Sequence, residues 1–261
     1  MYLSTLQEWL VWINKQYKPG HEIELGLARV RQVADNLELL SMPCPVITVG
    51  GTNGKGSTVA GLESIYRQAG YKVGAFTTPY LFEFNEIVRI NRLTARDEAF
   101  VAAYEQIEAA RGDIYLTPFE YNTLAALWLF KRAELDVILL EVGLGGRLDA
   151  VNIIDPILSI ITSISIDHVD YLGPTRESIG FEKAGIFRAN QTAICGDANP
   201  PETLLQHARA IKASLLIRNQ DFFAKNEGQT WSFTSKEARL PHLPHNPLAV
   251  DNMTSVVMAV T

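Results

Sequence analysis

Apolar residues recur every three or four positions in two stretches near the start of the chain, which predicts helices over 3–17 and 26–40. The sequence Lys18-Pro19-Gly20 between these stretches favours a turn. The pattern then changes to a short β-branched run at 45–49, which leads into a glycine-rich loop. Helical spacing resumes after the loop, and Gly70 is placed to end that helix.

The alternation of strand and helix continues along most of the chain. The run 136–142 is almost continuously apolar, as in parallel strands that are buried on both faces. Such alternation predicts a doubly wound, mostly parallel α/β sheet that binds ligands at the carboxyl ends of its strands. The other predicted strands are 72–76, 157–162, 192–195 and 214–217, and the other predicted helices are 95–110, 119–133, 174–185 and 201–213.

The pattern weakens after residue 221. Three prolines, Pro241, Pro244 and Pro247, predict an extended segment there. A final helix is expected to begin near Leu248 and to be cut off at Thr261, so that the chain ends inside an element.

Composition narrows the classes of protein. The chain has 261 residues, of which 47% are hydrophobic and 20% charged, which predicts a soluble globular protein of one or two domains. A net charge of −6 argues against nucleic acid and anionic membranes as partners. The start of the chain lacks the pattern of a signal peptide, and Cys44 and Cys195 are too few for a disulfide framework, so a cytoplasmic protein is expected.

The glycine-rich loop, residues 50–57, lies between a predicted strand and a predicted helix. Glycines let consecutive backbone N–H groups turn toward a phosphate, and the helix N-terminus adds a favourable dipole. Lys55 can neutralise phosphate charge, and the Ser57 hydroxyl can reach Mg²⁺. Gly56 interrupts the usual P-loop spacing between these two residues, and a glycine turn without a ligand is the alternative.

Polar residues follow the strands that should end beside this loop. Glu141 can hold Mg²⁺ on nucleotide phosphates, or it can pair with an arginine. The glycines of 143–146 indicate a close approach of backbone to ligand, and Asp149 can bind a pterin-type donor group or stabilise its own loop. His168 also follows a strand, so it can be a metal ligand, and a structural histidine is the alternative. The local sequence around Lys183 is typical of an exposed lysine.

In this order the motifs resemble the Mur ligase superfamily, and within it the bifunctional dihydrofolate synthase/folylpolyglutamate synthase family. The resemblance extends over residues 20–190 and more weakly to Asn252. The segments that carry it are Gly51-Thr52-Asn53-Gly54-Lys55-Gly56-Ser57, Thr77-Thr78-Pro79-Tyr80-Leu81, Phe119-Glu120-Tyr121, 141–149, Asp167-His168 and Glu182-Lys183-Ala184-Gly185-Ile186.

The resemblance implies a Mur ligase central domain of the P-loop type over residues 1–247, including a pterin-substrate loop. Residues 248–261 would then begin a linker to a C-terminal Rossmann-like domain, which in the family adds about 150 residues. That domain supplies contacts to glutamate and further contacts to ATP. The resemblance therefore implies a truncated chain with reduced activity. A monomer is also expected.

The resemblance also implies a role for each matched residue. ATP would bind Thr52, Asn53, Gly54, Lys55, Gly56, Ser57 and Asn252, and two Mg²⁺ ions would use Thr78, Glu141 and His168. The pterin substrate would bind Glu22, Ile23, Glu24, Leu25, Thr117, Pro118, Phe119, Glu120, Leu148, Asp149 and Ala150. Lys55, His168 and Lys183 would serve catalysis, with Lys183 carbamylated by CO₂ to give a carboxylate for the second Mg²⁺. Thr78 replaces the serine of the family, and the family often has aspartate at position 24.

The implied activity is an ATP-dependent amide ligase. The γ-phosphoryl group of ATP would convert a carboxylate into an acyl phosphate, and the amine of L-glutamate would then displace phosphate. The substrates would be dihydropteroate, which gives dihydrofolate, and folates, which give longer γ-glutamyl chains. Lys55 and two Mg²⁺ ions would offset charge on the transferred group.

Three other hypotheses fit parts of the sequence. A P-loop small-molecule kinase would leave phosphate on its acceptor and has no need of the 141–149 segment or Lys183. A non-enzymatic nucleotide-binding module would bind ATP with an unmodified Lys183 and no metal pair. Another Mur-type ligase would act on a cell-wall precursor, against which Phe119 and residues 22–25 favour a pterin by resemblance.

Overall fold

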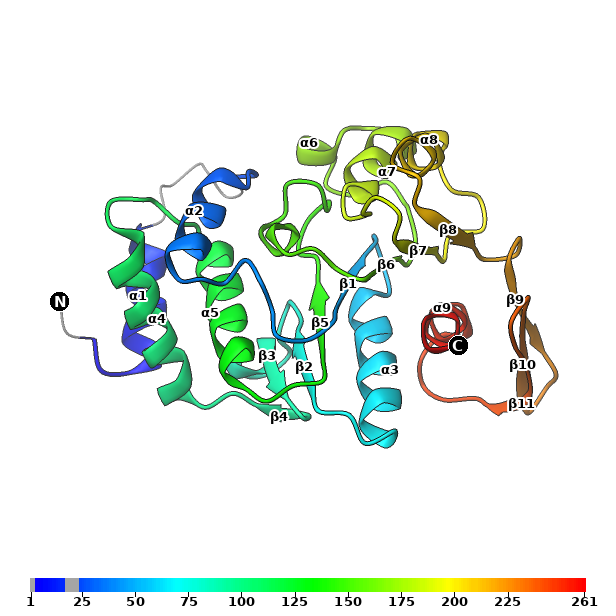
Figure 1. Cartoon of the computed structure of the whole chain (residues 1–261), viewed down its shortest axis with the longest axis horizontal. Coiled ribbons are helices and arrows are strands. Elements are labelled where there is room, and N and C mark those ends of the chain that lie inside the picture. Colours follow the sequence, from blue (N-terminus) through cyan, green and yellow to red (C-terminus); the bar gives the residue numbers. More distant parts are fainter. Residues whose placement is uncertain (1–2, 17–23) are drawn as a thin grey trace.

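The computed structural model describes residues 3–16 and 24–261, whose arrangement is shown in Figure 1. Within these residues, eight strands form one sheet in the order β4-β3-β2-β5-β1-β6-β7-β8. The strands are β1 (Val46–Gly50), β2 (Val73–Phe76), β3 (Val88–Ile90), β4 (Leu93–Thr94), β5 (Val137–Glu141), β6 (Leu158–Ile161), β7 (Thr192–Cys195) and β8 (Ser214–Ile217). At one edge, β3 pairs antiparallel with both β2 and β4, and the other neighbouring strands pair parallel. The predicted mostly parallel, doubly wound sheet is confirmed, although the sequence did not indicate these two short edge strands.

Helices cover both faces of the sheet because successive strand residues point to opposite sides. The helices are α1 (Leu6–Gln16), α2 (Ala28–Asn36), α3 (Lys55–Gln68), α4 (Asp97–Arg111), α5 (Pro118–Arg132), α6 (Val169–Leu172), α7 (Arg176–Ala184), α8 (Glu202–Ile211) and α9 (Val250–Val260), with 3-10 turns η1 (Phe84–Ile87) and η2 (Ala150–Ile153). In β5, Ile138 and Leu140 join an apolar cluster with α1, α2 and α4 to α8. Val137 and Leu139 join a second cluster with α3 and α9.

The predicted helices are present in the described residues, with ends that differ by a few positions. Gly70 follows the end of α3 with φ +91°, as expected of a residue that terminates a helix. The predicted turn Lys18-Pro19-Gly20 lies outside the described residues.

A second, antiparallel sheet of order β11-β10-β9 lies where the sequence predicted only an extended segment. Its strands are β9 (Phe222–Asn226), β10 (Thr230–Ser235) and β11 (Arg239–Pro244). Pro241 and Pro244 lie in an edge strand, where a residue without an N–H group does not break a hydrogen-bond ladder. Figure 1 shows α9 between α3 and this small sheet, and Phe233 shares a buried cluster with Val256 of α9.

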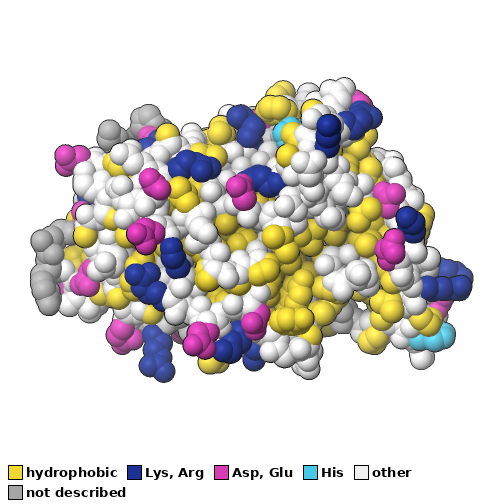
Figure 2. Space-filling view, viewed as in Figure 1, with side chains coloured by type: hydrophobic (Ala, Val, Ile, Leu, Met, Phe, Trp, Pro, Cys, Tyr) yellow, Lys and Arg dark blue, Asp and Glu magenta, His cyan; other side chains and the backbone are white. Residues whose placement is uncertain are grey.

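The surface carries charges of both signs. Figure 2 shows basic and acidic side chains interspersed over the viewed face.

Cys44 and Cys195 are free thiols. None of the helices in residues 3–16 and 24–261 is both long and apolar enough to cross a membrane.

Phe233 tests the packing of the small sheet, because its ring is fully buried. We expect Phe233→Ala to lower the free energy of unfolding by about 3–5 kcal/mol, since it leaves a cavity in the cluster that joins β10 to α9. Urea unfolding measures the loss. Phe223→Ala, in the neighbouring strand but 45% exposed, is the control and should cost less than about 1 kcal/mol. Equal losses in the two variants would contradict this packing.

Candidate active site

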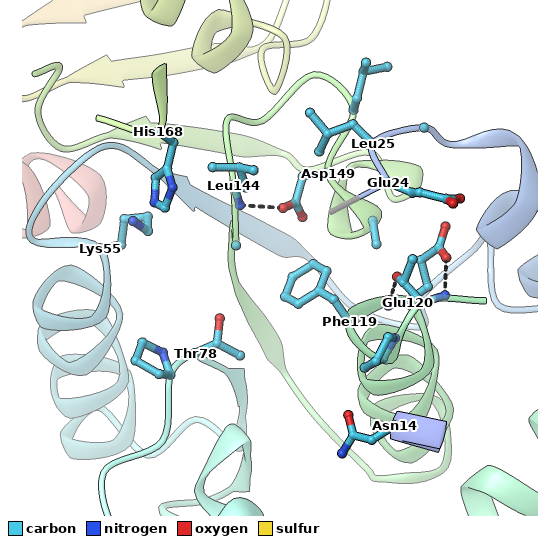
Figure 3. Close-up of a pocket in the computed structure, with 17 residues that line it drawn as sticks. Asn14, Glu24, Leu25, Lys55, Thr78, Phe119, Glu120, Leu144, Asp149 and His168 are labelled. Carbon is cyan, nitrogen blue, oxygen red and sulfur yellow. Dashed lines mark hydrogen bonds between the residues drawn. The ribbon is translucent and has the colours of Figure 1, made fainter. Parts of the chain in front are cut away.

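A cavity of about 620 Å³ lies at the carboxyl ends of the parallel strands (Figure 3). Lys55 follows β1, Thr78 follows β2, Gly143 follows β5 and His168 follows β6, and all four line it. In Figure 3, Lys55 and His168 lie toward one end of the cavity, and Glu24 toward the other. Chain segments that are far apart in sequence therefore meet at one edge of the sheet.

The cavity brings together most of the residues that were predicted to bind substrate. Nine of them line it: Glu24, Leu25, Thr117, Pro118, Phe119, Glu120, Leu148, Asp149 and Ala150. Glu22 and Ile23 lie outside the described residues. Five further residues line it without having been assigned to the substrate by the sequence: Asn14, Gly26, Pro79, Gly143 and Leu144. Pro79 and the segment 143–144 fall within matched motifs, but an exposed asparagine in an amphipathic helix gives no signal of a site.

The glycine loop between β1 and α3 is braced by the chain that follows β6. The Thr52 N–H donates to the Ser163 carbonyl at 2.8 Å, and the Asn53 N–H donates to Ser163 Oγ at 3.1 Å. Gly51 is required at this contact because it has φ +140° and a Cβ atom would lie 1.9 Å from Thr162 Oγ1. The loop is therefore held in one shape by the protein itself.

The turn into α3 gathers several residues that were predicted to bind nucleotide. Gly54 has φ +88°, and a Cβ atom there would lie 2.4 Å from Asn252 Oδ1, so the first turn of α9 closely approaches the loop. Lys55 Nζ donates to the carbonyls of Gly51 and Thr52, both at 3.1 Å. An ammonium group and a helix N-terminus thus lie together, which is an arrangement that binds phosphate.

Glu141, the last residue of β5, is 4% exposed. Its Oε2 accepts a hydrogen bond from the Thr78 N–H at 3.1 Å, and a Cβ atom on Gly56 would lie 3.8 Å from both carboxylate oxygens. Burial raises the pKa of Glu141 to about 7, although the positive charge of Lys55 and the Thr78 N–H oppose the shift. A desolvated carboxylate beside the glycine loop fits a divalent cation, which binds oxygen ligands.

The predicted metal ligands do not form a cage of their own. Among the described residues, there is no group of three or more histidine, cysteine, aspartate and glutamate side chains that could hold a metal ion. The His168 ring is about half exposed, and its Nε2 lies 3.7 Å from Asp167 Oδ2. Thr78 and His168 line the cavity, and Glu141 is hydrogen-bonded to the Thr78 N–H, so Mg²⁺ bound here would also need phosphate oxygens and water as ligands.

Asp149 stabilises its own loop and also lines the cavity. Its carboxylate accepts hydrogen bonds from the N–H groups of Leu144 at 2.8 Å and Val151 at 3.0 Å. Burial raises the pKa of Asp149 to about 6 in spite of these donors. Both alternatives from the sequence are therefore compatible with its position.

The glycines of 143–146 are crowded by the protein's own chain. A Cβ atom on Gly143 would lie 2.6 Å from the Phe119 ring, and one on Gly146 would lie 3.0 Å from the Glu182 carbonyl. The sequence indicated a close approach of ligand to backbone, and Gly143 does line the cavity. The structure adds a reason of its own for these glycines, which is the close approach of α5 and α7. These glycines position the cavity walls.

Lys183 is 3% exposed, so the indication from its local sequence, an exposed lysine, is wrong. The pKa of Lys183 is lowered to about 8, first by burial and second by the positive charge of Lys55, while Asp167 opposes the shift. A larger fraction of this amine is therefore neutral near physiological pH than for an ordinary lysine. A neutral amine is nucleophilic, as reaction with CO₂ requires.

Residues 49–240 match the Mur ligase middle domain, so the chain belongs to the Mur ligase family. This confirms the resemblance seen in the sequence. The glycine loop and the segments that carry Thr78, Glu141 and Lys183 all fall inside the match.

Within this class, the chain is similar to dihydrofolate synthase/folylpolyglutamate synthases. It is 46% identical to that of Haemophilus influenzae over 98% of this chain and 58% of the relative, and 48% identical to that of Escherichia coli over 92% and 57%. Its fold matches Escherichia coli FolC in complex with DHPP and ADP with a TM-score of 0.95 and 45% identity, over 98% of this chain and 62% of that one. It also matches a bifunctional folylpolyglutamate synthase/dihydrofolate synthase with Mn, AMPPNP and L-glutamate bound, with a TM-score of 0.91 and 42% identity, over 98% and 62%. The chain thus spans about three fifths of the length of these relatives.

Asp149 should make the stability of the ligand-free chain depend on pH. Because its pKa of about 6 exceeds the ordinary 3.8, the folded chain holds a proton between these values that the unfolded chain has lost. Its contribution to stability therefore falls as the pH rises through this window, by on the order of 3 kcal/mol.

Urea unfolding of wild type and Asp149→Asn at several pH values across this window measures the effect. The stability of wild type relative to the variant should decrease as the pH rises. Asp170→Asn, which changes an exposed aspartate, should leave the pH dependence of wild type unaltered. A difference between wild type and Asp149→Asn that stays constant with pH would contradict the assignment.

Proposed function

We propose that these residues form the ATP-binding and pterin-binding part of a carbon–nitrogen ligase, which joins L-glutamate to dihydropteroate and to folates. The observation that carries this proposal is one cavity that holds Lys55, Thr78 and His168 together with Phe119 and Asp149. The relatives bound to ADP, AMPPNP, Mn, DHPP and L-glutamate support it. Since those relatives are longer, we propose that contacts to L-glutamate come mainly from outside these residues.

The proposed reaction solves a problem of charge. A carboxylate is anionic and has no good leaving group, so an amine does not displace its oxygen at neutral pH. Transfer of the γ-phosphoryl group from ATP to a carboxylate oxygen releases ADP and gives an acyl phosphate. The neutral amine of L-glutamate attacks the acyl carbon, loses a proton, and inorganic phosphate leaves with the electrons of the broken C–O bond.

The phosphate end of the cavity would stabilise this transfer. Lys55 and the N–H groups at the start of α3 offset the negative charge of the transferred group. Thr78, Glu141 and His168 would hold Mg²⁺, which neutralises further phosphate charge when bound. The nucleotide contacts in this proposal are Thr52, Asn53, Gly54, Lys55, Gly56 and Ser57, with Asn252, which lies against Gly54.

The opposite end suits a flat heterocycle with N–H donors. Phe119 projects into the cavity and offers a ring for stacking (Figure 3). Asp149, Glu24 and Glu120 supply carboxylate acceptors around it. A pterin, which has an aromatic face and amino and ring N–H groups, matches both features.

Lys183 is proposed to react with CO₂, with its neutral amine attacking the carbon and losing a proton to leave a carbamate. The product is a carboxylate for a second Mg²⁺. Crystals grown with bicarbonate should show density for a carboxylate group beyond Nζ of Lys183 and none beyond the exposed Lys225. An unmodified Lys183 under these conditions would contradict this role.

Nucleotide affinity tests the phosphate end. We expect Lys55→Met to weaken binding of AMPPNP with Mg²⁺ by at least about tenfold, since a charge-assisted contact to phosphate is lost. Isothermal titration of the 261-residue chain measures this. Lys225→Met removes an exposed lysine of β9 and should leave the affinity unchanged. Equal affinities for wild type and Lys55→Met would contradict the site.

Product analysis tests the reaction itself. We expect this chain to bind ATP and dihydropteroate with little turnover, and a version extended by the remaining part of a relative to release ADP and inorganic phosphate only with L-glutamate. Dihydropteroate and tetrahydrofolate should both act as acceptors. A kinase would release ADP without phosphate, a binding module would release neither, and a cell-wall ligase would ignore both acceptors. Full glutamate-dependent turnover by the 261 residues alone would contradict the proposal that contacts to L-glutamate come mainly from outside them.

For the environment, we propose a monomeric cytoplasmic protein that binds small molecules. The two free thiols fit a reducing compartment, and the net charge of −6 disfavours nucleic acid.

A further inference from the structure

Arg29, in the first turn of α2, joins two walls of the cavity. Its Nη1 lies 3.0 Å from Glu24 Oε2, and its Nη2 lies 3.3 Å from Glu120 Oε1. Nη2 also donates to the Glu24 carbonyl at 3.2 Å. One guanidinium therefore holds both the side chain and the backbone of residue 24 against the start of α5.

Glu120 is itself part of the helix start that it stabilises. Its Oε2 accepts a hydrogen bond from the Thr117 N–H at 2.7 Å, and its own N–H donates to Thr117 Oγ1 at 3.2 Å. This capping box fixes the first turn of α5, which presents Phe119 to the cavity. A displacement of Glu120 would therefore displace the ring.

Charge makes the contact sensitive to the identity of residue 29. Glu120 is only 3% exposed, and its burial raises the pKa of its carboxyl while Arg29 and the Thr117 N–H lower it. Without a cation, this carboxylate would lie buried and uncompensated. A planar guanidinium can contact two carboxylates and a carbonyl at once, whereas a lysine ammonium is a single point charge.

A third wall of the cavity, the segment that carries Asp149, is joined to the segment of Glu24 by a different contact. The Gly26 N–H donates to the Leu148 carbonyl at 3.3 Å, which ties the segment after residue 24 to the segment that carries Asp149. Arg29 is not among the residues that line the cavity. It therefore supports a ligand through the residues that it holds and not by direct contact.

We propose that Arg29 is a positioning residue for the pterin end of the site, and that it sets the spacing between Glu24 and Phe119 by binding Glu24 and Glu120 together. This inference rests on the proposed function for the identity of the ligand. The geometry of the two walls does not depend on that identity.

The test compares Arg29→Met, Arg29→Lys and the control Arg31→Met in the 261-residue chain. Arg31 lies two positions further along the same helix and is exposed. Titrations measure the Kd for dihydropteroate and, separately, for AMPPNP with Mg²⁺. We expect Arg29→Met to raise the Kd for dihydropteroate by about 10- to 100-fold. Arg29→Lys should give a smaller rise, and all three variants should keep the wild-type Kd for AMPPNP.

Amide hydrogen exchange gives a second measurement that does not use the ligand. In Arg29→Met, the amides of residues 24–26 and of Thr117 should exchange faster than in wild type. The amides of β1 and β5 should be unchanged, and Arg31→Met should match wild type throughout.

The outcomes separate this inference from the proposed function. If wild type binds AMPPNP but not dihydropteroate, the proposed substrate is wrong, and faster exchange confined to the two walls would still support the role of Arg29. If Arg29→Met binds dihydropteroate within about twofold of wild type, or loses affinity for both ligands alike, Arg29 is not a positioning residue for this end. Failure of Arg29→Met to fold leaves Arg29→Lys to decide, since wild-type affinity in that variant would overturn the inference.

Discussion

Desolvation of charged groups at one edge of the parallel sheet is the constraint on which the site depends. Glu141, Asp149 and Lys183 are each at most 4% exposed, and burial shifts the pKa of each toward its neutral form. The fold tolerates these groups because strand ends bring charges of both signs together and backbone N–H groups face the carboxylates. Phosphates and cations would restore much of the lost solvation, so ligands should also stabilise the folded chain.

The main sheet and most helices could be predicted because their apolar residues repeat with the periods of buried strands and amphipathic helices. The small sheet could not, since Pro241 and Pro244 are typical of loops and are tolerated in β11 only because it lies at an edge. The local sequence also does not show that Lys183 is buried. Its burial depends on the elements that pack against α7.

In the candidate site too, residues in local motifs could be predicted, whereas residues that act through long-range contacts could not. Lys55 was predicted because it lies in the glycine-rich loop after β1, and Glu141 because it ends β5 at the same edge of the sheet. Arg29 was not, because Arg29 and Arg31 occupy the same predicted helix and look equivalent in sequence. What distinguishes Arg29 is a pair of partners 5 and 91 positions away. Side chains that support a site through long-range contacts therefore escape local motifs.

The hydrogen bonds between the glycine loop and the segment after β6 affect the order in which the chain folds during synthesis. The Asn53 N–H finds its partner, the Ser163 hydroxyl, 110 positions further along the sequence. During synthesis, the phosphate cradle therefore cannot reach its final shape until β6 has left the ribosome and paired with β1. A nucleotide that requires this loop shape would therefore bind only after β6 has paired with β1, and the incomplete nascent chain would not bind it.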